Sequence, residues 1–364
     1  MSGRVSLERC PQPDPTLLNL SVFSISYVRL LRTLSIAVSC LVGLILDDYL
    51  IAMDPYLDRC CIPKSELRPD RLQMSASPEI SSTIYKKLPH SEDSTFSRLI
   101  VLYPGSPNDD LRCYLEPWEV PMGSFKPSSM ALYVALSYAW GDPTETESIW
   151  CNDIPSKITR NLAAALRSLR REESALVVWA DAICVNQSDV SEKNAQVPVM
   201  AAIYKFAWVV VVWLGESSRD SQQAFGLLER LRNYDEHQPQ SREALGLPPT
   251  VDRLKPIHPA VEALGKLTQR PWFQRTWILQ EVACAVQVYI RCGKDHLSKD
   301  DFLFGLRWAS ELGLDPGFPD SAHLGAVTAF TLESMAQRES LLDILIQFRG
   351  NFATDPKDKI YAFY

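Results

Sequence analysis

Apolar runs alternate with amphipathic stretches between residues 98 and 214. The run Val209–Leu214 contains no polar residue, which is typical of a central parallel strand that is buried on both faces. Between such runs, apolar residues recur at helical spacing, as at Leu162, Leu166 and Leu169. This alternation predicts an α/β fold with a mainly parallel sheet flanked by helices. Strands are expected at 98–103, 132–138, 176–181 and 208–214, and helices at 161–171 and 192–206.

Two details refine the expected helices. Pro198 lies inside the second one, so it should kink that helix or mark its true start. Beyond residue 298 the pattern is again helical, and its last part carries one apolar stripe. That stripe consists of Leu341, Leu342, Leu345 and Phe348.

The chain divides into three parts by pattern. Residues 1–84 form an extension whose segment 54–84, rich in Pro, Ser and charge, is typical of a linker. An α/β core follows at 85–295, and a helical part at 296–364. The apolar stretch 34–46 is shorter than the roughly 20 residues that span a bilayer. Two interpretations of it stay open, a membrane anchor and a buried extension.

Net charge and cysteine content argue against two classes of function, nucleic-acid binding and metal binding. The 364-residue chain has a formal net charge of −7, which argues against a nucleic-acid-binding surface. Its nine cysteines include no Cys-x-x-Cys pair, and its five histidines are scattered, so no metal site is expected. A reducing cytoplasm is the simplest setting for these thiols.

Four ordered blocks resemble a known family. They are ALSYAWG (135–141), WADAICVNQ (179–187), YKFAWVVVVWLG (204–215) and RPWFQRTWILQEVACA (270–285). Together they resemble the heterokaryon incompatibility (HET) domain of filamentous fungi, over a stretch from about Tyr85 to the last residue. The resemblance implies a flavodoxin-like or TIR-like sheet with a helical C-terminal extension. Relatives continue beyond the position of Tyr364, which favours a truncated or short form.

The resemblance also supplies a candidate catalytic residue. Some TIR domains cleave NAD with one glutamate that follows a tryptophan at a fixed interval, and the interval from Trp277 to Glu281 is the same. A fixed carboxylate stabilises the positive charge that develops on the ribose when nicotinamide leaves. The alternative is that Glu281 only pairs with Arg275 or Arg270 near the surface.

Four further residues are candidates for an NAD pocket. Ser137 and Tyr138 end one predicted strand, Trp140 follows it, and Asp181 ends another, at the carboxyl ends where α/β sheets bind ligands. Trp140 could stack on a base or pack in the core. Asp181 could bind a ribose hydroxyl or stabilise its own turn.

Two functional hypotheses stay open. In the first, the chain is an effector of fungal non-self recognition and programmed cell death that acts by self-association and NAD cleavage. In the second, it is a non-catalytic self-associating signalling module. Either implies a homo-oligomer on activation, a separate recognition protein and no tightly bound cofactor.

Overall fold

The computed structural model describes residues 55–67, 83–89, 94–122, 130–232 and 258–312, together with positions 245, 247, 314 and 357. Residues from Tyr56 onward form one compact unit. The apolar stretch at 34–46 and the apolar stripe at 341–348 lie outside the described residues, as does most of the expected C-terminal helical part. Within the described residues, no helix is both long and apolar enough to cross a membrane.

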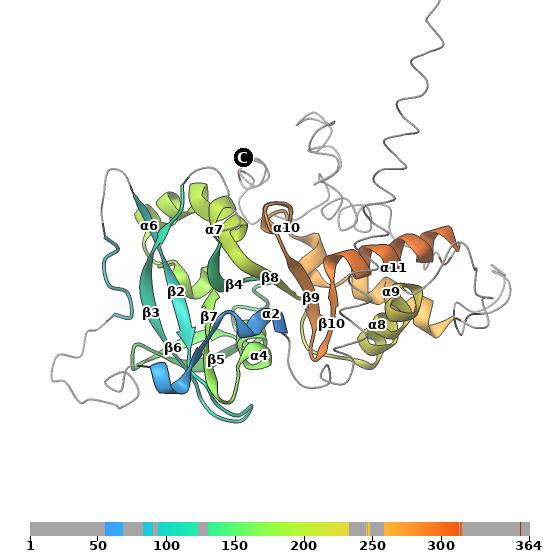
Figure 1. Ribbon diagram of the computed structural model, residues 1–364, viewed down its shortest axis with the longest axis horizontal. Helices are drawn as coiled ribbons and strands as arrows, with labels where there is room; N and C mark the ends of the chain where they lie inside the picture. Colours follow the sequence, from blue (N-terminus) through green and yellow to red (C-terminus); the bar gives the residue numbers. More distant parts are fainter. Residues whose placement is uncertain are drawn as a thin grey trace, which may run out of the picture. The chain divides into compact units, whose positions relative to one another are not determined.

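A single mixed sheet organises this unit (Figure 1). Its strand order is β10-β9-β8-β4-β7-β2-β3-β5-β6, and β1 pairs with β7 off this path. The strands are β1 (Cys61–Pro63), β2 (Thr95–Leu102), β3 (Leu111–Val120), β4 (Ala131–Tyr138), β5 (Thr146–Cys151), β6 (Ile154–Thr159), β7 (Ser174–Trp179), β8 (Ala207–Trp213), β9 (Val288–Cys292) and β10 (Asp295–Ser298).

The centre of the sheet is parallel, as the apolar runs predict. Strand β4 pairs in parallel with β7 and with β8, and β8 pairs in parallel with β9. From Val209 to Trp213, β8 is buried at every position, because helices and loops cover both of its faces. Antiparallel pairs surround this centre, as at β2 with β7 and β9 with β10. The fold is therefore α/β with a mixed sheet.

Chain order reverses between β4 and β8. After β4 the chain first forms β5 and β6 at one edge of the sheet and then β7 beside β4 on that side. It then returns past β4 to β8 and β9 on the other side. The order β7-β4-β8-β9 is the flavodoxin-like arrangement, whose ligands bind outside the carboxyl ends of the two strands at the reversal. In this chain those ends are the residues that follow Tyr138 and Trp213.

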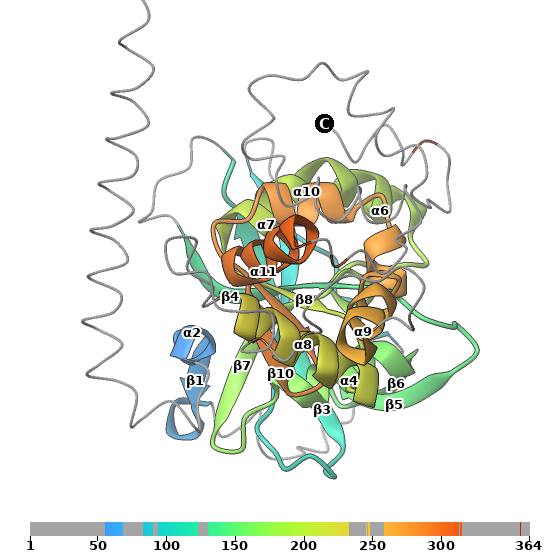
Figure 2. The ribbon, with the colours of Figure 1, turned by 90° about the vertical axis from the view of Figure 1, so that its right-hand side faces the viewer.

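Helices cover the sheet in two groups. Helix α7 contacts β4, β8 and α10, and Figure 2 shows α7 and α10 side by side. Helices α8, α9 and α11 pack on one another beside β9 and β10. The helices are α2 (Pro55–Asp58), η2 (Lys64–Glu66), α4 (Arg160–Leu169), α5 (Asp181–Cys184), α6 (Val190–Gln196), η4 (Val197–Val199), α7 (Met200–Phe206), α8 (Arg219–Arg232), α9 (Pro259–Thr268), η5 (Pro271–Gln274), α10 (Ile278–Ala283) and α11 (Lys299–Glu311).

Two local predictions, the break at Pro198 and the linker at 54–84, can be compared with the structure. Pro198 does break the helix expected at 192–206, since α6 ends at Gln196 and α7 begins at Met200. The expected linker at 54–84 is not all linker, because its residues 55–67 form α2, β1 and η2, and Cys61 of β1 pairs with Leu176 of β7. Three residues of β1 carry too little pattern to reveal a strand. The boundary at residue 84 stays a prediction.

Two helical glycines give a matched test of the packing between α8 and α11. A Cβ on Gly305 of α11 would lie 2.7 Å from the Leu228 side chain and 3.2 Å from backbone atoms of the same residue. A Cβ on Gly226 of α8 would meet only Arg230, at 3.7 Å. We therefore expect Gly305→Ala to lower the free energy of unfolding by about 1–3 kcal/mol, because the helices must separate. Gly226→Ala should raise it by up to about 1 kcal/mol. Urea unfolding measures both, and equal effects of the two substitutions would contradict the close approach.

Candidate functional site

Glu281 lies in a buried polar cluster beneath the end of β4. It is only 1% exposed, and Arg275 holds it in a two-pronged ion pair, with Nη1 donating to Oε2 at 3.1 Å and Nη2 to Oε1 at 2.9 Å. The hydroxyl of Ser137 on β4 also donates to Oε2. Trp272 of η5 donates its indole N–H to the same hydroxyl at 2.7 Å. The cluster thus ties α10 and η5 to the central strand.

Burial and charge act in opposite directions on this carboxylate. Burial raises the pKa of Glu281 above its ordinary value of 4.5, while Arg275 and the Ser137 hydrogen bond oppose the rise without cancelling it. For Arg275, burial acts to lower the pKa, but the carboxylates of Glu281 and Asp181 raise it overall. The guanidinium of Arg275 therefore stays charged, and this charge stabilises the ionised form of Glu281.

Asp181 and Trp140 form the more exposed side of the same region. The indole N–H of Trp140, which is 44% exposed, donates to Oδ2 of Asp181 at 2.8 Å. The other carboxylate oxygen accepts from the backbone N–H of Ala182 at 2.8 Å, so Asp181 also stabilises its own turn at the start of α5. The contact with Ala182 agrees with the turn-stabilising alternative for Asp181, and the binding of a ribose hydroxyl stays a prediction.

Tyr138 connects the two sides. Its ring is 2% exposed, and burial, followed by the negative charge of Asp181, raises the pKa of its hydroxyl. The charge of Asp181 also acts on Arg275 and Glu281. The structure therefore brings together all five candidate residues at the carboxyl ends of β4 and β7. Their roles in catalysis or NAD binding stay predictions.

A second buried ion pair fixes the loop after Asp181. Arg98 of β2, 3% exposed, donates to both carboxylate oxygens of Glu192 at 2.6 and 3.0 Å. Glu192 also accepts from the backbone N–H of Asn186 at 2.7 Å. Gln187 donates to the carbonyl of Asp181 at 2.9 Å. These contacts hold the shape of the loop, and sequence reasoning missed Arg98 and Glu192 because 94 residues separate them.

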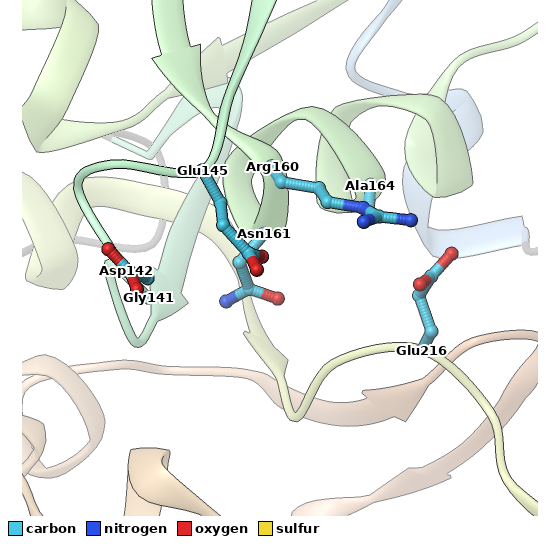
Figure 3. Close-up of a pocket in the computed structure, with 7 residues that line it drawn as sticks. All are labelled: Gly141, Asp142, Glu145, Arg160, Asn161, Ala164 and Glu216. Atoms are coloured by element: carbon cyan, nitrogen blue, oxygen red, sulfur yellow. The ribbon is translucent and has the colours of Figure 1, made fainter.

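A pocket of about 280 Å³ opens beside this region, at the reversal of chain order (Figure 3). The loop after β4, the first turns of α4 and the loop after β8 contribute its walls. It is lined by Gly141, Asp142, Glu145, Arg160, Asn161, Ala164 and Glu216. Sequence reasoning did not identify it, although its position fits the rule for ligand sites of open α/β sheets.

Asn161 fixes the walls of this pocket. Its side-chain N–H donates to the carbonyl of Ala139 at 2.6 Å, and its oxygen accepts from the indole N–H of Trp213 at 3.0 Å. One residue of α4 therefore holds the ends of both β4 and β8. Gly141 and Gly215, with φ of 80° and 102°, turn the two strands into their loops.

The geometry limits the chemistry that this arrangement can perform. Glu281 accepts three hydrogen bonds from Arg275 and Ser137 and is closed to solvent. Asp181 is only partly buried. Within the described ranges, no group of three or more His, Cys, Asp or Glu side chains gathers in a way that could hold a metal ion.

Comparisons with known proteins identify the segment that builds this site. The sequence model of the family described as heterokaryon incompatibility protein (HET) matches residues 133–281, from β4 to Glu281 itself. The chain is also similar to heterokaryon incompatibility protein 6, OR allele, of Neurospora crassa. The two are 34% identical over 245 residues, which cover 57% of this chain and 35% of that protein. The chain thus spans about a third of the length of this curated relative. No solved structure matches the chain.

The ion pair of Arg275 and Glu281 yields a stability prediction. Arg275→Gln leaves a buried carboxylate without its cation, so the free energy of unfolding at pH 7 should fall by about 3–5 kcal/mol. Adding Glu281→Gln removes that charge and should restore about 2 kcal/mol or more. Urea unfolding of the two variants measures this, and Glu311→Gln, which breaks an exposed pair with Arg307, is the matched control with little effect.

The same variant should respond to pH with a defined sign. A raised carboxylate pKa means that the folded state binds the proton more tightly, so stability falls as pH rises from 4.5 toward the folded pKa. Without Arg275 the folded pKa of Glu281 rises further and the window widens. Arg275→Gln should therefore lose more stability at pH 8 than at pH 5, and a loss independent of pH would contradict the assignment.

Proposed function

Residues 133–281 are a heterokaryon incompatibility (HET) domain, and on this premise we propose that the chain acts as an effector of fungal non-self recognition that leads to programmed cell death. The similarity to heterokaryon incompatibility protein 6 supports the proposal. We further propose that the effector signals by self-association, with a separate protein supplying the recognition.

One observation favours a non-catalytic role for the domain. The only glutamate that the resemblance proposes as catalytic is closed off by Arg275 and Ser137 and is 1% exposed. A residue that acts on a substrate must reach the reacting atoms within hydrogen-bonding distance. Glu281 therefore serves best as a structural tie between α10 and β4, and the signal arises from assembly.

NAD cleavage is the second candidate, and a different observation favours it. Ser137, Tyr138, Trp140 and Asp181 lie around Glu281 at the carboxyl ends of parallel strands, where nucleotides bind in this class of sheet. Cleavage by Glu281 requires the Arg275 fork to open, so that the carboxylate faces the ribose. In this candidate NAD is a substrate, and no cofactor is tightly bound.

Assembly and catalysis can be separated with the full chain. As protein concentration rises, sedimentation velocity should show larger species, while chromatography shows no nicotinamide release from added NAD. Assembly should persist in Arg275→Gln/Glu281→Gln, which removes both charges of the buried pair together and so leaves neither unpaired.

Two other outcomes would contradict the proposal of a non-catalytic, self-associating domain. Nicotinamide release by the assembled protein that disappears in the double variant, with an unchanged circular dichroism spectrum, would establish NAD cleavage instead. A chain that stays monomeric at all concentrations would refute self-association. Glu311→Gln serves again as the exposed control and should behave as the unchanged chain does in both assays.

A further inference from the structure

The pocket between the ends of β4 and β8 has no part in the function proposed above. We propose that it binds a small amino acid of net positive charge. The carboxylate of the ligand would pair with Arg160, and its cationic groups would pair with Glu145 and Glu216. Three observations carry this assignment: charges held apart, an excess of carboxylates, and the size of the space.

Opposite charges line this pocket without meeting. In the part of the chain that the structure describes, Arg160 makes no ion pair with Glu145 or Glu216, although all three line one space. In Figure 3 the guanidinium of Arg160 reaches toward Glu216 across the opening. Nearby Arg167, by contrast, pairs with Glu147 at 3.4 Å. The gap between the pocket charges is thus available to a ligand that bridges them.

The backbone around these charges is tied in place. Arg160 and Asn161 begin α4, where the Thr159 hydroxyl accepts from the N–H of Leu162 and caps the helix. On the opposite wall, Arg270 donates to the carbonyls of Leu214 and Glu216 at 2.7 and 3.1 Å. Because both walls are anchored, their charges cannot close the gap by a shift of the backbone.

The lining selects the sign and the size of the ligand. The lining contains three carboxylates, from Asp142, Glu145 and Glu216, and one guanidinium, so a ligand with more positive than negative charge complements the pocket. One oxygen of Asp142 already accepts from Thr144, which leaves Glu145 and Glu216 to bind the cationic groups. The excess of carboxylates disfavours inorganic phosphate, although α4 begins here. The volume of about 280 Å³ lies just below the roughly 300–1,000 Å³ of pockets that hold drug-sized ligands. That space suits a single amino acid and is small for a dinucleotide.

Isothermal titration of the full chain with L-arginine tests the proposal. We expect saturable binding, with L-glutamate and inorganic phosphate giving none. Agmatine, which lacks the carboxylate, should bind about tenfold more weakly than L-arginine. In Arg160→Gln this order should reverse, because the carboxylate of L-arginine loses its partner while agmatine keeps both cationic groups for the carboxylates of the pocket.

The carboxylates and a matched control complete the design. Glu145→Gln and Glu216→Gln should each weaken L-arginine binding by about tenfold. Lys193→Gln, which removes an exposed cation of α6 that does not line the pocket, should leave binding unchanged. Absence of saturable L-arginine binding, binding that these substitutions do not alter, or tighter binding of phosphate or L-glutamate would overturn the proposal. None of these outcomes bears on self-association or NAD cleavage, which are measured separately.

Discussion

The buried ion pair between Arg275 and Glu281 is the contact on which this region of the fold depends. The Glu281 carboxylate is not stable in the interior without the Arg275 guanidinium, since an unpaired buried ion costs several kcal/mol. The Arg275 side chain itself is 20% exposed. The pairing of the two places α10 against β4, where Ser137 and Trp272 complete the hydrogen bonds. A second buried pair, Arg98 with Glu192, fixes the neighbouring loop after β7 in the same way. The carboxyl ends of β4 and β7 are thus positioned by polar contacts between segments that are far apart in sequence.

These polar contacts fix the relative positions of the segments more than they raise the free energy of unfolding. An apolar pair of similar volume would pack in the same space at no desolvation cost, and buried ion pairs are often no more stabilising than such replacements. The charged groups instead fix the orientation of the side chains that they join. A forked guanidinium fits a carboxylate in one geometry, whereas apolar side chains tolerate many arrangements. The same property fixes the orientation of Glu281, because both of its carboxylate oxygens accept hydrogen bonds from Arg275 or Ser137.

The parallel centre of the sheet could be predicted from sequence, because it rests on local signals. The apolar runs expected at 132–138, 176–181 and 208–214 correspond to β4, β7 and β8, with small shifts at the ends. Strand β3 could not be predicted in this way, since Pro117 within it argues against a strand and its pairings with β2 and β5 account for it. The pairing of Glu281 with Arg275 was foreseen as an alternative, because six residues separate the two. Its contact with Ser137 joins residues 144 apart, and no periodicity encodes such a distance.

The loop after β4 belongs to both the buried cluster and the open pocket. Trp140 of this loop donates to Asp181, whose charge acts on Arg275 and Glu281. The next residue, Gly141, lines the pocket and adopts a left-handed backbone conformation that a residue with a Cβ rarely takes. The carbonyl of Ala139, just before Trp140, is held by Asn161, which also holds β8 through Trp213. A displacement of the loop after β4 would therefore change both the buried cluster and the open pocket. The loop at the reversal of chain order lines the pocket and, through Trp140 and Asp181, also connects the pocket to the ion pair of Arg275 and Glu281.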